Sequence, residues 1–343
     1  MNIQVKPVRT VELSKADFVS KQTPRWCPGC GDYSILANVQ KVMPELNIPR
    51  ENIVFVSGIG CSSRFPYYMN TYGLHTIHGR APAFATGLKV ARPDLSVWIV
   101  TGDGDGLSIG GNHLMHALRR NVDLQILLFN NETYGLTKGQ YSPTSRPGTR
   151  SPSSPSGSLD SPFLPCVLAL GAGANFVARG VDTAVKDLSA TFKRARSFSG
   201  TAFIEIFQNC LVYNDKVFSD FTDREVTSEL QVVTMHGLPL IFGREKNKGL
   251  RFDPVRVELE VVTLGENGIT EEDVLVHDET NRTLAALLAA MQPPNHPMAI
   301  GVLYSNPVDT YESQVYSQIA AAQNGGANLD DVIRRGHTWR VNG

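Results

Sequence analysis

Short apolar runs rich in β-branched residues alternate with helix-like segments between about residue 31 and residue 210. Most positions within each run are apolar, with Gln125 and Glu205 as interruptions, as expected of strands that are buried on both faces. Strands that alternate with helices form βαβ units and a parallel sheet. We therefore predict one α/β domain with a doubly wound parallel sheet. The predicted strands are 53–56, 97–100, 124–129, 176–177 and 202–207.

Two regions depart from this alternation. Segment 141–165 is dense in Ser, Pro and Gly and is predicted to be a long surface loop, and loops of this length inside a domain usually have a function. After about residue 233 the alternation weakens, leaving one predicted strand at 255–264 and one predicted helix at 281–291, and the polar tail from Gln323 is expected to order only against a partner. The predicted organisation is an N-terminal arm (1–23), a main domain (24–233) and a partner-contacting C-terminal extension (234–343).

Composition and charge are those of an ordinary globular protein. Hydrophobic residues make up 42% of the chain, and 32 Lys and Arg residues balance 33 Asp and Glu residues. A net charge of -1 gives no general attraction to nucleic acid or to an acidic membrane. No apolar run approaches the roughly 20 residues that span a bilayer, and the first residues lack the apolar stretch of a secretory signal. We expect a cytoplasmic protein that acts on small molecules and protein partners, with neither nucleic acid nor membrane among them.

Four of the predicted strands run directly into chemically distinctive loops. In an open parallel sheet, ligands bind beyond the carboxyl ends of the strands, so these loops are expected to face one crevice. The loops are SGIGC (57–61), TGDGDG (101–106), NNETYG (130–135) and QNC (208–210).

The TGDGDG and NNETYG loops carry the strongest signal. The glycines of the first let the backbone approach a ligand and offer N–H groups at the start of a helix predicted near Ile109, which suits a diphosphate. Asp103 supplies a hard oxygen for a divalent cation. The amide oxygen of Asn131 and the backbone carbonyl of Thr133 could complete the protein's share of a Mg²⁺ site, with phosphate oxygens as further ligands.

A single GDG sequence is more often only a tight turn. The whole pattern of strand, GDG, helix, strand and Asn-Asn is instead similar to the thiamine diphosphate fingerprint. A dinucleotide-binding glycine loop requires an acidic residue at the end of the next strand, where this chain has Asn130 and Asn131. Thiamine diphosphate is therefore favoured over a nicotinamide cofactor.

Four of the five cysteines are expected to meet at the same end of the sheet. Cys27 and Cys30 form a C-x2-C pair, and Cys61 and Cys210 each follow a predicted strand. Cys166 lies in an apolar, helix-like stretch and is predicted to be a buried, unreactive thiol. The residues alone allow zinc, a redox dithiol or an iron–sulfur cluster. A thiamine site in the same crevice favours the cluster, because an oxidised thiamine intermediate needs an electron acceptor, which zinc cannot be.

Five motifs together resemble the beta subunits of 2-oxoacid:ferredoxin oxidoreductases, from about residue 23 to residue 220 and more loosely beyond. They are WCPGCG, GIGCSSR, HTIHGRAPAFATGLK, GDGDGLSIGGNHLMHALRRN and LLFNNETYGLTKGQYSPTS. The fourth motif looks closest to the 2-oxoglutarate branch of the family. The resemblance implies a thiamine diphosphate-binding fold, Mg²⁺ held by Asp103, Asn131 and Thr133, and a 4Fe-4S cluster on the four cysteines 27, 30, 61 and 210.

The resemblance also implies an activity. This is the oxidative decarboxylation of 2-oxoglutarate with coenzyme A to succinyl-CoA and CO2, with electrons passing through the cluster to ferredoxin. Pyruvate or a broad range of 2-oxoacids is the alternative substrate. Arg64 and Lys138 are expected to contact the substrate, and the guanidinium of Arg64 would suit the distal carboxylate of 2-oxoglutarate.

The expected site is incomplete within one chain. Thiamine enzymes activate the cofactor with a glutamate, and no glutamate here has a convincing context, so an alpha subunit is expected to supply it in an αβ or α2β2 assembly. Two other classes of protein remain as alternatives: a thiamine enzyme with structural zinc and a non-catalytic metal-binding scaffold. For His78, a purely structural role is the alternative to contact with the cofactor. The expected cofactor contacts are Gly60, His78, Gly102, Asp103, Gly104, Asp105, Asn131, Thr133, Gly135, Leu136 and Thr137.

Overall fold

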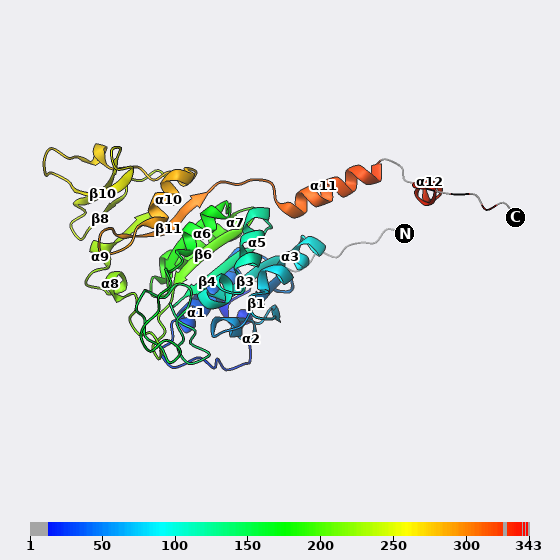
Figure 1. Cartoon of the computed structure of the whole chain (residues 1–343), viewed down its shortest axis with the longest axis horizontal. Coiled ribbons are helices and arrows are strands. Elements are labelled where there is room, and N and C mark those ends of the chain that lie inside the picture. The colour runs from blue at the N-terminus through cyan, green and yellow to red at the C-terminus, as the bar shows by residue number, and fades with distance from the viewer. Residues whose placement is uncertain (1–12, 325–327, 338, 340, 342–343) are drawn as a thin grey trace.

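An eight-stranded sheet lies at the centre of the molecule, in the order β2-β1-β3-β4-β6-β5-β11-β7 (Figure 1). The computed structural model describes residues 13–324, 328–337, 339 and 341. Neighbouring strands are parallel except β5 and β11, which pair antiparallel, so the sheet is mixed and mostly parallel. Its strands are β1 (Ile53–Ser57), β2 (Tyr72–His75), β3 (Ser96–Gly102), β4 (Gln125–Asn130), β5 (Phe176–Val181), β6 (Ala202–Phe207), β7 (Gln231–Thr234) and β11 (Met298–Ser305).

Helices cover both faces of the sheet, because successive side chains of a strand point to opposite sides. On β1, Ile53 and Phe55 join one hydrophobic core, whereas Val54 and Val56 join the other. This two-sided burial explains the continuous apolar runs of the sequence. The first core contains α1 (Asp32–Val42), α2 (Phe65–Tyr68) and α7 (Val185–Ser197), and the second contains α3 (Ala81–Ala91), α5 (Gly111–Arg120), α6 (Pro165–Gly171) and α10 (Arg282–Ala290).

The five predicted strands are present as β1, β3, β4, β5 and β6, and the predicted helix 281–291 is present as α10. The helix expected near Ile109 begins earlier: α4 (Asp103–Leu107) follows β3 directly, and α5 starts at Gly111. Strand β2 was not predicted, because all four of its residues are exposed at the sheet edge and form no apolar run. Strand β11 was also missed, although it returns the chain to the main sheet beside β5.

The C-terminal residues form a second, three-stranded antiparallel sheet, in the order β10-β9-β8. The strand predicted at 255–264 corresponds to β10 (Glu258–Thr263), which pairs with β9 (Lys248–Asp253), while β8 is Ile241–Phe242. Buried side chains of this sheet, including Leu250 and Leu259, join the core around α10. Short helices α8 (Ser219–Thr222) and α9 (Thr227–Leu230) precede β7.

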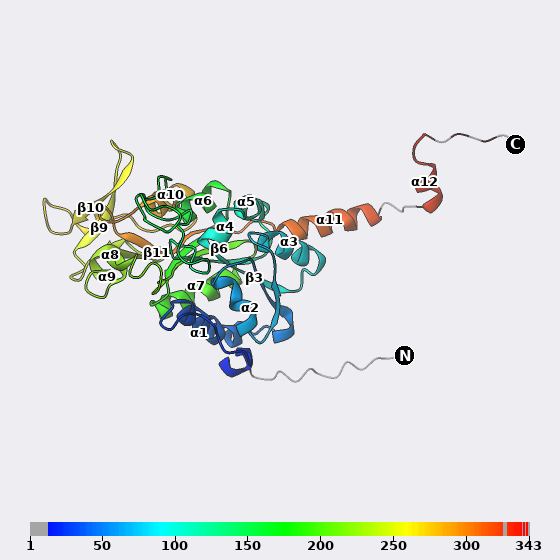
Figure 2. The same ribbon diagram turned by 60° about the horizontal axis from the view of Figure 1, so that its bottom comes forward.

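Two further helices, α11 (Tyr311–Asn324) and α12 (Leu329–Arg334), extend away from the body at the end opposite the small sheet (Figures 1 and 2). Residues 1–12 of the expected N-terminal arm lie outside the described residues. The same holds for residues 325–327, 338, 340 and 342–343 of the polar tail. No helix in the described part of the chain is both long enough and apolar enough to cross a membrane.

A buried ion pair joins the C-terminal region to the centre of the sheet. Arg179 on β5 and Glu205 on β6 are each 1% exposed, and the Nε of Arg179 donates to an oxygen of Glu205 at 2.9 Å. The same guanidinium donates to the carbonyl of Ala289 on α10 at 3.2 Å and to that of Ala299 on β11 at 3.4 Å. One arginine therefore ties two elements of the C-terminal region to β5 and β6.

Removing one partner of this ion pair should destabilise the fold strongly, because the other charge would stay buried without compensation. We expect Arg179→Met to lower the free energy of unfolding by about 3–5 kcal/mol. Urea unfolding followed by tryptophan fluorescence measures this loss. Arg256→Gln, which removes one partner of the exposed ion pair with Glu258, is the control and should leave the midpoint unchanged. Equal midpoints for Arg179→Met and the wild type would contradict the assigned role of the pair.

Candidate functional site

A cavity of about 190 Å³ lies at the carboxyl ends of β1, β3 and β4. Strand order reverses between β1 and β3, and this switch point is where open α/β sheets bind ligands. All eleven residues expected to contact the cofactor line this cavity. They are Gly60, His78, Gly102, Asp103, Gly104, Asp105, Asn131, Thr133, Gly135, Leu136 and Thr137.

Asp103 begins α4 and is 2% exposed. Its Oδ2 accepts hydrogen bonds from the hydroxyls of Ser142 and Thr144, both at 2.6 Å. Burial raises the pKa of Asp103 to about 6, and the two hydroxyl hydrogen bonds oppose that rise. A bound divalent cation would also favour the ionised carboxylate. The Ser/Pro/Gly-rich segment is thus a loop, as predicted, but Ser142 and Thr144 are buried against Asp103 rather than lying at the surface.

Asn131 follows β4, and hydrogen bonds to both the nitrogen and the oxygen of its side-chain amide fix its orientation. Its Nδ2 donates to Gln208 Oε1 at 2.8 Å, and its Oδ1 accepts from the backbone N–H of Thr133 at 3.1 Å. An amide oxygen has two lone pairs, so Oδ1 retains one for a cation. One carboxylate, one amide oxygen and one backbone carbonyl are hard oxygen donors of the kind that Mg²⁺ takes beside phosphate oxygens. These residues therefore fit the cation that the sequence predicts.

The buried carboxylate of Asp105 joins the loops that follow three strands. Its Oδ1 accepts from the backbone N–H groups of Ile59 at 2.9 Å and Gly79 at 2.7 Å, and lies 2.6 Å from the Nδ1 of His78. Its Oδ2 accepts from the hydroxyl of Thr101 at 2.6 Å. Asp105 thus holds the edge of the cavity together, and it orients the His78 ring that lines it.

Two glycines are required here because other side chains occupy the space of a Cβ atom. A Cβ on Gly58 would lie 2.0 Å from Asp105 Oδ2, and a Cβ on Gly104 would lie 2.2 Å from the ring of Tyr134. The hydroxyl of Tyr134 donates to the Gly104 carbonyl at 3.0 Å. The GDG sequence thus packs directly against the Asn-rich loop.

The structure places two of the four expected cluster cysteines, Cys61 and Cys210, close together beside the cavity, whereas Cys27 and Cys30 are not among the residues that line it. Cys61 lines the cavity, and the sulfurs of Cys61 and Cys210 lie 3.6 Å and 3.5 Å from the position of a Cβ on Gly135. The indole of Trp26 donates to the Cys61 carbonyl at 2.6 Å and so fixes the C-x2-C segment beside it. Cys27 is exposed, and the other three are partly buried.

The surroundings of these thiols favour their neutral form. Burial and the nearby carboxylate of Asp32 raise the pKa of Cys30, and the same two causes raise the pKa of Cys61 to about 12. The charge of Cys210 contributes to both shifts. Such thiolates require positive charge to be stable. Over residues 13–324, 328–337, 339 and 341, no three His, Cys, Asp or Glu side chains are arranged around a single metal ion.

Three other sequence-predicted residues lie outside this cavity. Cys166 is fully buried in α6, as predicted, 3.2 Å from a carboxylate oxygen of Glu205. Arg64 lies beside Cys61, but its guanidinium donates to the Arg25 carbonyl at 3.1 Å. Lys138 is exposed. Neither Arg64 nor Lys138 is among the residues that line the cavity, so the contact of these two with substrate stays a prediction.

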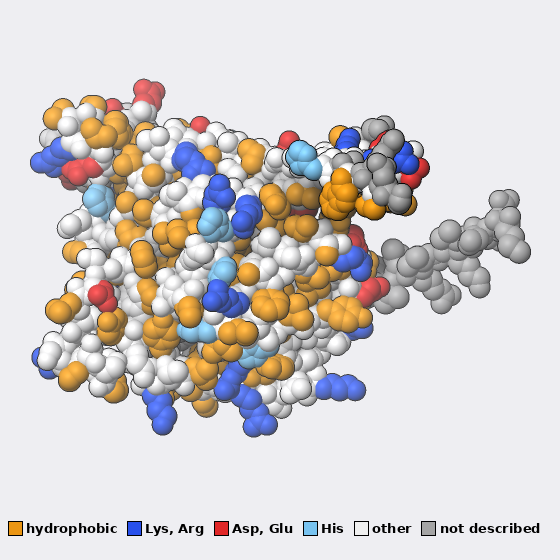
Figure 3. All heavy atoms as spheres, turned by 45° about the vertical axis from the view of Figure 1, so that its right-hand side comes forward, with side chains coloured by type: hydrophobic (Ala, Val, Ile, Leu, Met, Phe, Trp, Pro, Cys, Tyr) orange, Lys and Arg blue, Asp and Glu red, His pale blue; other side chains and the backbone are white. Residues whose placement is uncertain are grey.

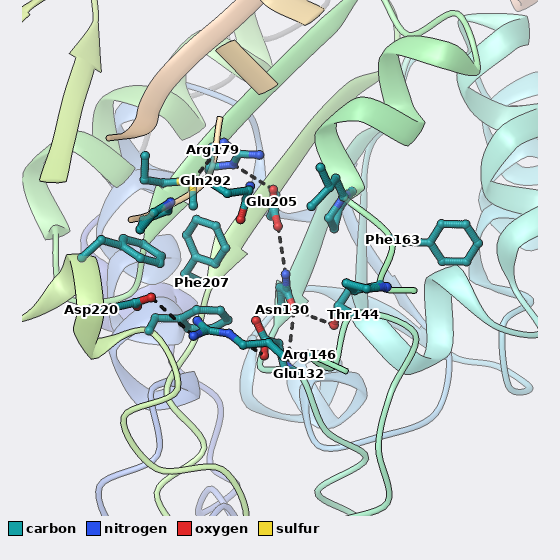
Figure 4. A pocket seen from close by; sticks show the side chains of 17 residues that line it. Asn130, Glu132, Thr144, Arg146, Phe163, Arg179, Glu205, Phe207, Asp220 and Gln292 are labelled. Carbon is teal, nitrogen blue, oxygen red and sulfur yellow. Dashed lines mark hydrogen bonds and ion pairs between the residues drawn. The ribbon is translucent and has the colours of Figure 1, made fainter. Parts of the chain in front are cut away.

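A second cavity, of about 210 Å³, is lined by Asn130 and Thr144 among other residues (Figure 4). Asn130 Nδ2 donates to Glu205 at 2.9 Å, and the Thr144 hydroxyl lies 3.0 Å from Asn130 Oδ1 and 2.6 Å from Asp103. The single hydroxyl proton of Thr144 can be donated to only one of these two acceptors at a time, so the continuous hydrogen bonds run from Asn130 through Glu205 to Arg179, and Thr144 contacts both Asn130 and Asp103.

Glu132 lines this second cavity, 3.4 Å from Arg146, and burial raises its pKa to about 7. No glutamate is among the described residues that line the first cavity.

Sequence reasoning missed four side chains that shape the site. Ser142 and Thr144 support Asp103, Tyr134 packs on Gly104, and Gln208 contacts Asn131. Gln208 had a detectable signal, since it follows β6 at the sheet edge where Asn131 follows β4. Ser142 and Thr144 had none beyond their place in a long loop, because only folding brings that loop under Asp103.

Comparisons with known proteins agree with this geometry. Residues 58–206 match the family model described as "Thiamine pyrophosphate enzyme, C-terminal TPP binding domain". The chain is 48% identical to the 2-oxoglutarate oxidoreductase subunit KorB of Mycobacterium tuberculosis, over 95% of this chain and 88% of that protein. It is also 45% identical to the 2-oxoglutarate synthase subunit KorB of Methanocaldococcus jannaschii, over 55% of this chain and 70% of that protein.

The fold matches a solved enzyme over almost its whole length. This is the 2-oxoglutarate:ferredoxin oxidoreductase from Magnetococcus marinus with 2-oxoglutarate, coenzyme A and succinyl-CoA bound. The TM-score is 0.74 and the identity 33%, over 94% of this chain and 95% of that one. Three findings agree: the match to the thiamine-binding domain, the 48% identity to KorB over nearly the full length, and this structural match. They show that the chain belongs to the beta-subunit family of the 2-oxoacid:ferredoxin oxidoreductases.

Proposed function

We propose that this chain is the beta subunit of a 2-oxoglutarate:ferredoxin oxidoreductase. The complete enzyme would convert 2-oxoglutarate and coenzyme A to succinyl-CoA and CO2, and would pass the two electrons singly through a 4Fe-4S cluster to ferredoxin. The proposed substrate follows the names of the relatives from M. tuberculosis and M. jannaschii and the ligands of the M. marinus enzyme.

One observation carries the proposal: Asp103, Asn131 and Cys61 line one cavity. Asp103 and Asn131 line it from the ends of β3 and β4, and Cys61 lines it from the end of β1. Gly135 lines it as well, and a Cβ atom on Gly135 would contact the sulfurs of both Cys61 and Cys210. An electron acceptor next to a thiamine cofactor is needed for oxidative decarboxylation and has no use in a non-oxidative thiamine enzyme.

Each part of the site would have a separate task. The carboxylate of Asp103, the amide oxygen of Asn131 and the carbonyl of Thr133 would hold Mg²⁺ against the diphosphate, while Cys27, Cys30, Cys61 and Cys210 would ligate the cluster. The bound thiamine diphosphate would supply an electron sink for decarboxylation. The chain's own residues would hold that cofactor and exclude water from it.

An alpha subunit is the proposed partner, in an αβ or α2β2 assembly. The lining of the cavity includes no glutamate that could activate the cofactor within the described residues. Ile59, Ile109 and Leu136, around the cavity and the start of α5, are 37–54% exposed, and one face of the molecule carries many exposed hydrophobic side chains (Figure 3). A partner that covers Ile59, Ile109 and Leu136 would bury their side chains and complete the site.

Metal retention through Asp103 is testable in the complex. We expect Asp103→Asn, which keeps the shape but loses the charge, to reduce bound thiamine diphosphate at least about 10-fold, since a direct ligand to the cation is weakened. Thiamine content after gel filtration of the co-expressed αβ complex measures this. Asp94→Asn removes an exposed carboxylate paired only with Arg92 and should retain the cofactor. Full cofactor content in the Asp103 variant would refute the metal assignment.

The cluster assignment predicts different outcomes for two cysteines. Cys210→Ser should remove most iron, sulfide and visible absorbance from anaerobically purified complex, because a thiolate ligand is lost. Cys166→Ser should retain them, because Cys166 is buried in α6. Wild-type protein that contains zinc and no iron would favour the structural-zinc alternative, and protein without thiamine would favour the scaffold alternative.

The proposed contact between Arg64 and substrate predicts a change in substrate preference. We expect Arg64→Ala to lower kcat/KM for 2-oxoglutarate about 10- to 100-fold, since a hydrogen bond between charged groups contributes about 1.5–3 kcal/mol. Activity with pyruvate, which lacks the distal carboxylate, should change little. Viologen reduction with each substrate measures both values. Equal losses would show that Arg64 does not select the substrate.

A further inference from the structure

Gln208 lies between the cysteine cluster and the metal-binding loop. It follows β6 and is 1% exposed. Its Nε2 donates to the sulfur of Cys30 at 3.4 Å, and its Oε1 accepts from Asn131 Nδ2 at 2.8 Å. Asn131 carries the amide oxygen assigned to the cation, and Cys30 carries a sulfur assigned to the cluster. One side chain therefore contacts a ligand of each centre.

The orientation of the Gln208 amide is determined by its partners. Asn131 Nδ2 can only donate, so the atom that faces it must be the amide oxygen of Gln208. The amide nitrogen then faces Cys30 and the carbonyl of Asn209, both of which accept. The N–H···S direction follows from the hydrogen-bonding partners.

From this geometry we infer that Gln208 couples the two centres, so that binding of Mg²⁺ and thiamine diphosphate raises the reduction potential of the cluster. This inference rests on the proposed function. A hydrogen bond to a ligating sulfur stabilises the added electron of the reduced cluster and so raises its potential. A cation on Asn131 Oδ1 makes the Nδ2 group a stronger donor to Gln208. Hydrogen bonds in such a chain polarise one another, so the bond from Gln208 to Cys30 strengthens as well.

The coupling has a reciprocal consequence. If cofactor binding raises the potential, reduction of the cluster must tighten cofactor binding by the same free energy. A tenfold difference in affinity between the oxidised and reduced enzyme corresponds to about 59 mV for this one-electron couple.

The test is an anaerobic redox titration of the co-expressed αβ complex, followed by electron paramagnetic resonance. The midpoint potential is measured with Mg²⁺ and thiamine diphosphate and after their removal with a chelator. In the wild type we expect the higher potential in the loaded form. Gln208→Met keeps the size of the side chain and removes both hydrogen bonds. Its potential should be lower than that of the wild type and unchanged by loading.

A second variant and a control keep the outcome clear. Gln208→Glu keeps an acceptor for Asn131 and removes the donor to Cys30, so it too should lower the reduction potential of the cluster. This variant replaces Gln208→Met in the titration if the methionine variant loses its cluster. Gln231→Met removes a partly buried glutamine that bonds the Phe221 carbonyl and should titrate like the wild type. A potential that responds equally to loading in the wild type and in the Gln208 variants would overturn the inference. Absence of iron from the wild type would instead refute the proposed function.

Discussion

The buried carboxylate of Asp105 is the interaction on which the arrangement of the site depends. It is 3% exposed, and a charge removed from water in this way is tolerated only when donors surround it. Those donors come from the loops after β1 and β2 and from the end of β3. The three segments must therefore converge at the switch point of the sheet, where the cavity lies. The glycine at position 58 is required by the same carboxylate, because a Cβ would collide with it.

The surroundings of the Asp103 carboxylate reach further into the protein through packing. Thr144 contacts both Asp103 and Asn130. Asn130 donates to Glu205, which pairs with Arg179 (Figure 4). That arginine also holds α10 and β11. The C-terminal elements are thus attached to strands that lead to the first cavity, although none of their described residues line it.

The features that make the site incomplete also explain its place in an assembly. Cofactor-binding backbone, hard oxygen ligands and cysteines are all present on one chain, whereas an activating glutamate is not found around the cavity in the part of the chain that the structure describes. Helices α11 and α12 extend from the body, and Val332 and Ile333 on α12 are 52% and 66% exposed. A partner subunit that covers these side chains would bury their apolar surface.

The sequence by itself determined the parallel core and the location of the site. Continuous apolar runs reveal strands buried on both faces, and the carboxyl ends of such strands must meet at one edge, so the order of residues alone places the GDG, Asn-Asn and cysteine loops together. Only the tertiary structure decided which side chains support them. The strand β2 escaped prediction because its four residues are exposed at the sheet edge and form no apolar run. The strand β11 was missed although it is an apolar run (MAIGVLY), and only the tertiary structure shows that it pairs with β5. Ser142, Thr144 and Gln208 escaped for a related reason: their partners, Asp103, Asn131 and Cys30, lie between 39 and 178 positions away in the chain, and hydrogen bonds over such separations exist only once the fold has formed.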